Sequence, residues 1–345
     1  MPTNVKLGIA AEFFDVQGNL RFPAPGIELL SKYPQIKHRA LENDLEITAE
    51  QRGDCDMVIT GGTRWNEAAV AAGSDRLIAL LMTGVGYDHI DVKALTAANV
   101  MLCFAPDAVR RPMAATIFTF VLALATRLLE KDKLTREGRW LEQKNYSGEG
   151  LEGKTFGSIG VGNIGREFFK LLAPFGMNHL ACDPYVSQEA VDDLGVKLVD
   201  MNTLLAESDY VSLSVPLSDA TYHLVGEPEF KKMKPTAYFI NTARGGLVDE
   251  PALIRALEEK WIRGAGLDVF EQEPVDPRNP LLKMDNVVVA PHCLCVTDEY
   301  LKLAWSGRLR HADQISRGEI PAEVVNKDVL EKADFKRKFA NYTSA

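Results

Sequence analysis

The chain has 345 residues, which is more than a single hydrophobic core usually supports, so two lobes are expected. Charged residues make up 25% and hydrophobic residues 46%, a balance that excludes a disordered chain and favours a globular one. The formal net charge of −9 provides no general attraction to phosphate backbones, so nucleic acid is not expected as a partner.

The cysteines and the first residues indicate the compartment. The five cysteines, an odd number, lie mostly in scattered apolar stretches, unlike a disulfide framework; they are Cys55, Cys103, Cys182, Cys293 and Cys295. Residues 1–14 lack the basic region and the long apolar run of a secretory signal. We therefore expect a cytoplasmic protein that needs no membrane.

Short apolar runs predict β-strands along both halves of the chain. In the first hundred residues they cover 5–10, 57–60 and 77–82, and in the second half 156–160, 179–182, 210–214, 237–241, 264–268 and 287–290. Helical patterns separate most of them. This alternation predicts an α/β fold with doubly wound parallel sheets, whose ligands bind at the carboxyl ends of the strands.

The most apolar stretch, residues 117–129, is shorter than a bilayer span and is interrupted by Thr119, Thr126 and Arg127. It predicts a buried helix at about 116–130 that joins the lobes. Because it is apolar nearly all the way round, two domains or a second subunit must cover it, and we expect a homodimer. Further along, a helix is expected at 298–316, and the charged tail 331–345 either packs on the first lobe or frays.

A glycine motif follows the strand expected at 156–160. Gly160 permits a tight turn, Gly162 lets the backbone approach a pyrophosphate, and Gly165 allows close packing of helix on strand. The helical pattern at 167–174 supplies a helix N-terminus for the phosphates. The motif in this context predicts a dinucleotide site, whereas glycines alone would be weak evidence.

Asp183 ends the next expected strand, about 20 residues on, where such sites place an acid that accepts hydrogen bonds from the adenosine ribose. No Arg or Lys follows closely to compensate a 2′-phosphate, so NAD is favoured over NADP. The alternative is a flexible glycine turn with an ordinary surface aspartate.

Three polar residues follow later strands of the second half. Arg244 lies after the strand at 237–241, Glu273 after 264–268 and His292 after 287–290. A guanidinium clamps a carboxylate and polarises a carbonyl, and a histidine held by a carboxylate donates a proton near neutral pH. Singly, each has an ordinary structural interpretation. Together they form a complete set for reducing a 2-oxo acid by hydride transfer.

With two further blocks, 84–91 (Gly-Val-Gly-Tyr-Asp-His-Ile-Asp) and 211–217 (Val-Ser-Leu-Ser-Val-Pro-Leu), the region 77–297 resembles the D-isomer-specific 2-hydroxyacid dehydrogenases, including hydroxypyruvate and glyoxylate reductases and phosphoglycerate dehydrogenases. The resemblance implies a Rossmann NAD-binding domain, 106–297, inserted into a flavodoxin-like substrate domain. That domain begins with 1–105 and is completed by a helix and tail, 298–345. The resemblance also implies dimerisation through the long apolar helix.

The resemblance also implies roles for individual residues. Arg244 binds the substrate carboxylate and carbonyl, Glu273 orients His292, and His292 transfers the proton. Val85 and Gly86 offer backbone N–H groups to the carboxylate. The implied cofactor contacts are Gly160, Gly162, Asn163, Ile164, Gly165, Asp183, Pro216, Thr242, Ala243 and Asp268, the last of which holds the nicotinamide amide.

The chain departs from the family pattern in three places. Cys293-Leu-Cys295 follows His292 where relatives have small residues, Ala115-Thr116 replaces a glutamate and a histidine, and the unusual Arg110-Arg111-Pro112 precedes that pair. The cysteines and His292 also suggest a metal site, but a second ligand pair is missing and no metal is expected.

Further substrate-binding candidates are Arg64, Trp65, Arg110, Arg111 and Trp140. Cations on an acidic protein favour a short, polar 2-oxo acid, such as hydroxypyruvate or a sugar-derived acid, over branched aliphatic ones. The alternative is a solvated helix start for the arginines and a dimer contact for the tryptophan. Two alternative functions stay open: an NADH-binding regulatory member like the family's corepressors, and a formate dehydrogenase, which Glu273 argues against.

Overall fold

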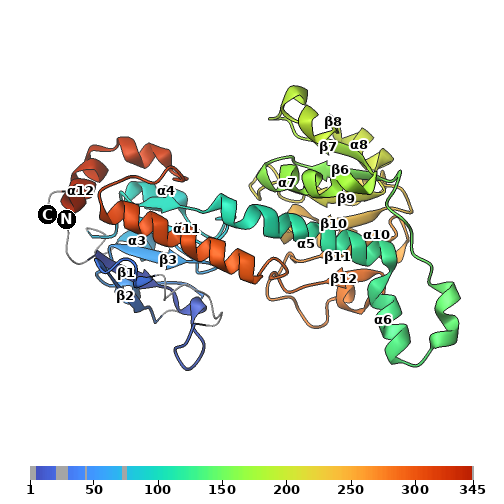
Figure 1. The fold of residues 1–345 in the computed structure, drawn as a ribbon, viewed down its shortest axis with the longest axis horizontal. Coiled ribbons are helices and arrows are strands. Elements are labelled where there is room, and N and C mark those ends of the chain that lie inside the picture. The colour runs from blue at the N-terminus through green and yellow to red at the C-terminus, as the bar shows by residue number, and fades with distance from the viewer. Residues whose placement is uncertain (1–4, 21–29, 43–44, 72–75, 344–345) are drawn as a thin grey trace. The chain divides into compact units, whose positions relative to one another are not determined.

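The computed structural model describes residues 5–20, 30–42, 45–71 and 76–343, and the chain divides into two compact units (Figure 1). Unit 1 comprises residues 1–109 and 297–345, and unit 2 comprises residues 110–296. Unit 2 is therefore inserted into the chain of unit 1.

Unit 1 contains a five-stranded parallel sheet with the order β2-β1-β3-β4-β5. The strands are β1 (Val5–Ile9), β2 (Ile36–Ala40), β3 (Met57–Thr60), β4 (Ala79–Met82) and β5 (Met101–Cys103). The helices are α2 (Ala49–Arg52), α3 (Glu67–Ala71), α4 (Val92–Ala97), α11 (Asp298–Ser316) and α12 (Ala333–Thr343). The strand order is that of flavodoxin-like folds.

Unit 2 contains a seven-stranded parallel sheet with the order β12-β11-β10-β9-β6-β7-β8. Its strands are β6 (Thr155–Ile159), β7 (Asn178–Cys182), β8 (Val196–Leu198), β9 (Tyr210–Leu213), β10 (Tyr238–Asn241), β11 (Gly264–Leu267) and β12 (Val287–Val289). Its helices include α7 (Asn163–Leu172), α8 (Met201–Glu207), α9 (Glu227–Phe230) and α10 (Glu250–Glu258). The strand order reverses between β6 and β9, as in Rossmann folds. The predicted fold class is confirmed.

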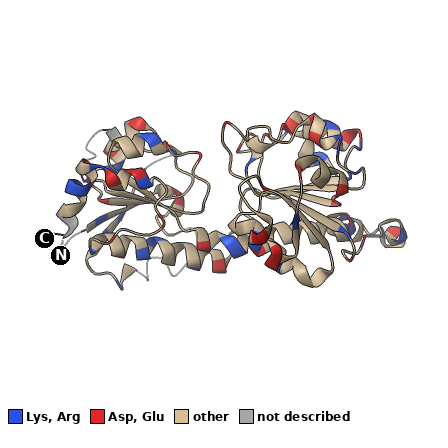
Figure 2. Cartoon of the chain, turned by 90° about the horizontal axis from the view of Figure 1, so that it is seen from above, with Lys and Arg blue, Asp and Glu red and all other residues tan. Residues whose placement is uncertain are grey.

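The interior strands are buried along their whole length, which explains why they were visible as apolar runs. Every residue of β3, β4, β9, β10 and β11 is buried. Figure 2 shows that the acidic and basic residues lie largely on the helices and loops, while the strands carry few. Helices that cover both faces of a parallel sheet require such continuous apolar strands.

Three strands, β2, β5 and β8, were missing from the predicted set. Only Ile36 is buried in β2, and only Val196 is buried in β8, because these strands lie at sheet edges. β5 is another edge strand, and its three residues are too few for a pattern. Edge position and shortness remove the signal that apolar periodicity provides.

The long apolar helix differs from the prediction at both ends. α5 (Pro106–Thr126) begins ten residues before the expected start, with Arg110, Arg111 and Pro112 inside it. The chain then turns at Arg127, which has a left-handed backbone with φ 54°, and continues as α6 (Leu128–Arg136). Among the described residues α5 is the one helix long and apolar enough to cross a membrane, but 61% of its most apolar window is buried, as in the core helix of a globular unit.

The C-terminal segment packs on unit 1. α11 has the predicted bounds and is capped by Thr297, whose hydroxyl accepts a hydrogen bond from the Tyr300 N–H. Phe335 and Phe339 of α12 are buried in the apolar core of unit 1 and stack on each other. The tail therefore packs back, the first of the two expected outcomes.

Candidate functional site

Arg244, Glu273 and His292 follow three neighbouring strands of unit 2, β10, β11 and β12. Because the strands are parallel and adjacent, their carboxyl ends meet at one edge of the sheet. The three side chains, which are far apart in the sequence, are thereby brought to one end of unit 2.

His292 is oriented by Glu273. The imidazole Nδ1 and the carboxylate Oε2 lie 2.7 Å apart. His292 has a left-handed backbone with φ 52°, and its N–H donates to the carbonyl of Asp268 at 2.7 Å. Such a backbone conformation is rare outside glycine and is kept only where the surroundings hold it. The opposite ring nitrogen, Nε2, has no hydrogen-bond partner among the described residues, so it is available for a ligand.

Glu273 is poised to stay ionised. Burial by itself would raise the pKa of this carboxyl, but the hydrogen bond and charge of His292, the Phe270 N–H and the charge of Arg244 outweigh burial and lower it. The influence of Arg244 on Glu273 shows that the cation acts on the same group of side chains. The set therefore combines a fixed anion, an imidazole and a guanidinium.

Close packing holds the Arg244 loop against the Glu273 loop. A Cβ added to Gly245 would overlap the backbone of Phe270 and Glu271. Behind Arg244, the Asn241 side chain donates to the Arg244 carbonyl at 2.8 Å and accepts from the Ala243 N–H at 3.0 Å. Glycine at position 245 is thus required by the close approach of two backbones.

A group of polar contacts that sequence analysis missed supports the Glu273 loop. Glu271 Oε1 lies 2.7 Å from His223 Nε2 and accepts from the Tyr222 hydroxyl at 3.0 Å. The Glu271 N–H donates to the Glu250 carboxylate at 3.0 Å. The 48 residues that separate His223 from Glu271 leave no local sequence signal for this contact.

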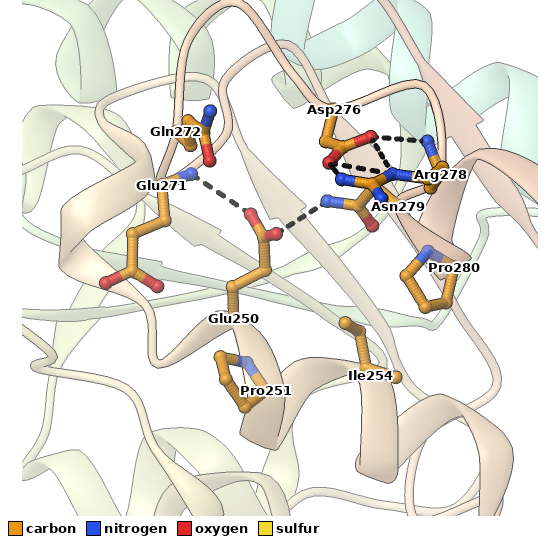
Figure 3. A pocket seen from close by; sticks show the side chains of 9 residues that line it. All are labelled: Glu250, Pro251, Ile254, Glu271, Gln272, Asp276, Arg278, Asn279 and Pro280. Atoms are coloured by element: carbon orange, nitrogen blue, oxygen red, sulfur yellow. Dashed lines mark hydrogen bonds and ion pairs between the residues drawn. The ribbon is translucent and has the colours of Figure 1, made fainter.

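A cavity of about 660 Å³ adjoins this supporting group in unit 2. Figure 3 shows the Glu250 carboxylate between the Glu271 backbone nitrogen and the Asn279 side chain, and Arg278 paired with Asp276. Arg244, Glu273 and His292 do not line the cavity. It is therefore distinct from the side-chain set at the strand ends.

The glycine motif fits a dinucleotide. Gly160 has φ 92°, and a Cβ there would lie 2.5 Å from the Ser214 carbonyl oxygen, so only glycine is accommodated. A Cβ on Gly162 would meet nothing within 4 Å, which leaves open space at the N-terminus of α7. Gly162 caps this helix without a side-chain hydrogen bond, so the first N–H groups of α7 are free for phosphate oxygens.

Asp183 lies at the end of β7, beside the glycine turn. Its Oδ2 accepts from the Val161 N–H and its Oδ1 from the Tyr185 N–H, each at 3.0 Å. These bonds orient the carboxylate and leave lone pairs for the two ribose hydroxyls. The predicted contacts Asn163 and Ile164 open α7, while Pro216, Thr242, Ala243 and Asp268 follow β9, β10 and β11.

Asp268 orders the segment after His292. Its Oδ1 accepts from the N–H groups of Cys293 and Leu294 at 3.1 and 3.3 Å. Burial raises the pKa of Asp268 above its ordinary value, and burial raises the pKa of the Cys295 thiol to about 12. Cys293 is exposed. Among the described residues no cluster of three or more His, Cys, Asp or Glu side chains is arranged for a metal.

The candidates of unit 1 lie after β3 and β4. Val85 and Gly86 are half-buried and lie in the loop after β4, three and four residues beyond its carboxyl end. Arg64 is exposed, and its N–H donates to the Leu45 carbonyl. The expectation that Trp65 contacts a substrate is wrong, because its side chain is 1% exposed and its Nε1 donates to the Thr60 hydroxyl. The large apolar ring fills the core under this loop instead.

The remaining candidates belong to unit 2. Arg111 donates to Glu167 at 2.9 Å, and Arg110 lies 4.0 Å from the same carboxylate, so one acid partly offsets both cations. Trp140 is 63% exposed in a short 3₁₀ segment, Trp140–Asn145. Within the described part of the chain, no contact joins Arg111 or Trp140 to Arg244, Glu273 or His292.

Comparison with known proteins identifies the family. A model described as the NAD-binding domain of D-isomer-specific 2-hydroxyacid dehydrogenases matches residues 118–293. A glyoxylate reductase of Korarchaeum cryptofilum is 38% identical over 288 residues, which is 83% of this chain and 87% of that protein. A D-3-phosphoglycerate dehydrogenase of Methanocaldococcus jannaschii is 38% identical over 279 residues, 80% of this chain and 53% of that protein.

The fold supports the same assignment. The crystal structure of a glyoxylate reductase from Paecilomyes thermophila superimposes with a TM-score of 0.79 at 28% identity, covering 95% of this chain and 100% of that one. The sequence matches, the Rossmann unit and the fit of the glycine turn agree. The chain belongs to the D-isomer-specific 2-hydroxyacid dehydrogenases and is an NAD-dependent oxidoreductase of that family.

Proposed function

We propose that the protein reduces a small, polar 2-oxo acid to the D-2-hydroxy acid with NADH. The observation that carries this proposal is the His292–Glu273 pair, 2.7 Å apart, with the charge of Arg244 acting on the same carboxylate. The relatives named glyoxylate reductase support a short substrate. A carboxylate next to a carbonyl is the chemistry that a guanidinium binds through two parallel hydrogen bonds.

Each residue has a distinct part in the proposed reaction. When bound, the cofactor supplies the hydride for the carbonyl carbon. Arg244 binds the carboxylate and polarises the carbonyl oxygen. His292, protonated, donates its Nε2 proton to that oxygen as negative charge develops, since Nδ1 is engaged by Glu273. Glu273 remains an anion and stabilises the imidazolium throughout.

Substrate preference tests this proposal. We expect a higher kcat/KM for hydroxypyruvate or glyoxylate than for the branched 2-oxoisocaproate, measured as NADH oxidation. The Arg110→Ala/Arg111→Ala variant should lose part of this preference, because it removes two local cations. Arg136→Ala, on the exposed face of α6, is the matched control for loss of a cation. Faster turnover of the branched acid by the wild type would refute the proposed substrate class.

The pH dependence tests the role of Glu273. Glu273→Gln keeps a hydrogen-bonding side chain but removes the charge that stabilises the imidazolium. Reduction needs the protonated ring, so the pH at which the rate of reduction falls to half should move to lower values. Glu259→Gln, an exposed change of the same charge at the end of α10, should leave that midpoint in place. An unchanged profile in Glu273→Gln would contradict the proton relay.

We also propose that unit 2 forms a homodimer. Large apolar side chains are exposed on and after α5: Leu122 at 37%, Leu128 at 56%, Leu129 at 48%, Trp140 at 63% and Leu141 at 92%. Large apolar side chains exposed close together in the sequence favour a protein interface. A second copy of the chain is one of the two covers expected for the apolar helix, the other being the two domains of the chain itself.

The alternative that the sequence left open was a regulatory member of the family that binds NADH without turnover. It would use the same glycine turn and Asp183. The complete Arg244, Glu273 and His292 set favours the enzyme, because binding of the dinucleotide alone requires no proton donor. Measurable 2-oxo acid reduction by the wild type separates the two.

A further inference from the structure

Arg308 is a buried cation in unit 1. Its side chain comes from α11 and is 1% exposed. Its Nη1 donates to the Thr83 hydroxyl, and its Nε donates to the Ala304 carbonyl at 2.9 Å. The guanidinium carbon lies 4.4 Å from the centre of the Trp305 ring and 5.0 Å from that of Phe13. The charge is therefore packed against two aromatic rings and bonded to a hydroxyl and a carbonyl, and the phenol of Tyr300 also acts on it.

No carboxylate of the described residues forms an ion pair with Arg308. Glu12 acts on it only through its charge, without an ion pair, and the Glu12 oxygens instead accept from the N–H groups of Gly61 and Gly62, each at 2.6 Å. Burial lowers the pKa of Arg308 to about 10, so the guanidinium is still charged at neutral pH. Burying a cation without a paired anion costs several kcal/mol, roughly, and an apolar residue would usually be more stable there. A requirement other than stability explains its presence.

Thr83 connects this charge to the loop after β4. The Thr83 N–H and hydroxyl both donate to the Thr60 carbonyl, at 2.9 and 3.2 Å. Gly84 follows with φ 90°, so the chain turns sharply. The next N–H groups, of Val85 and Gly86, have no acceptor among the described residues and are only half-buried. The loop thus starts from a fixed anchor and presents two free donors.

We propose that Arg308 is a positioning and specificity residue: by holding Thr83 it fixes the loop of Val85 and Gly86, where the family resemblance already implies that the carboxylate of the 2-oxo acid binds. The inference rests on the proposed function. Arg308 does not touch the substrate, because it is enclosed beneath the loop. Val85 lies within about 7 Å of Thr83 along the chain, so the buried charge acts on an anion at the free N–H groups with little screening by water. Arg308 thereby favours ionised substrates over neutral carbonyl compounds.

Arg308→Met tests the inference by separating stability from substrate binding. The variant removes a buried, unpaired charge and keeps most of the volume, so the melting temperature should stay the same or rise. KM for glyoxylate and Ki for oxalate, a non-reacting dicarboxylate, should each rise roughly tenfold, which corresponds to about 1.4 kcal/mol of binding. The kcat should be unchanged, since the lost interaction serves the bound substrate and the transition state equally.

Arg310→Met is the matched control. Arg310 lies two residues away on α11, is 56% exposed and pairs with Glu323. The Arg310→Met substitution changes the net charge of the chain by the same amount but leaves the contact with Thr83 in place. The KM and Ki of this variant should therefore stay at the wild-type values. Arg308→Lys keeps the charge but loses the guanidinium group. Its KM for glyoxylate and Ki for oxalate should lie between those of Arg308→Met and the wild type.

Thr83→Val provides a second route if Arg308→Met fails to fold. It removes the hydroxyl that accepts from Arg308 and should also raise KM for glyoxylate. An unchanged KM and Ki in a folded Arg308→Met enzyme, or a fall in melting temperature with no change in KM, would assign Arg308 a structural role only. Absence of reductase activity in the wild type would refute the proposed function, independently of Arg308.

Discussion

Replacing His292 with alanine should leave NADH binding intact and lower kcat for 2-oxo acid reduction by a factor on the order of 10²–10⁴, the usual contribution of a positioned general acid. The reason is local. Nε2 of His292 is the ring nitrogen without a partner among the described residues, while Nδ1 is held 2.7 Å from Glu273. Alanine removes the proton donor, but the glycine turn and Asp183 are untouched. Steady-state kinetics and NADH fluorescence titration measure the two parts.

His38→Ala controls for loss of an imidazole. His38 is exposed on β2 of unit 1 and follows none of the strand ends of unit 2. The kcat of the His38→Ala variant should equal that of the wild type. A His292→Ala enzyme that retained wild-type turnover would exclude this histidine as the proton donor, and a loss of NADH binding would point to a wider disturbance of unit 2.

Replacing Gly245 with alanine should be the most damaging small substitution in unit 2. The added Cβ would overlap the backbone of Phe270, so the loop with Arg244 and the loop with Glu273 must separate. Overpacking costs roughly 1–3 kcal/mol and occasionally more, and the overlap with rigid backbone atoms places this substitution at the upper end. A displacement of about 1 Å at a catalytic group lowers activity roughly 10²-fold. Thermal unfolding and kcat/KM should therefore both fall.

Gly246→Ala is the neighbouring control. Its Cβ would lie 3.3 Å from a terminal carbon of Leu217, and this flexible side chain can give way. The variant should keep most of its stability and activity. Equal damage from the two substitutions would mean that the loop tolerates no side chain at all, and would contradict the argument from the contact with Phe270.

Much of the chemistry could be predicted from local sequence patterns. Buried parallel strands produce continuous apolar runs, and the residues after each run fall at one edge of a sheet. For this reason Arg244, Glu273 and His292 could be grouped from their positions after three apolar runs. The glycine turn and Asp183 are local as well, because each needs only a strand, a turn and a helix in succession. Outer strands such as β2 were not predicted, because most of their side chains are exposed to solvent and form no continuous apolar run.

By itself the sequence determined the α/β class, the dinucleotide turn and the identity of the catalytic candidates, because these depend on residue type and short spacing. Tertiary structure alone decided which distant groups meet. The Glu271–His223 contact, the burial of Trp65 and the enclosure of Arg308 beside Thr83 join residues that no periodicity links. The sequence does not distinguish a buried arginine or tryptophan from an exposed one, because only the packing of neighbouring elements removes the side chain from water.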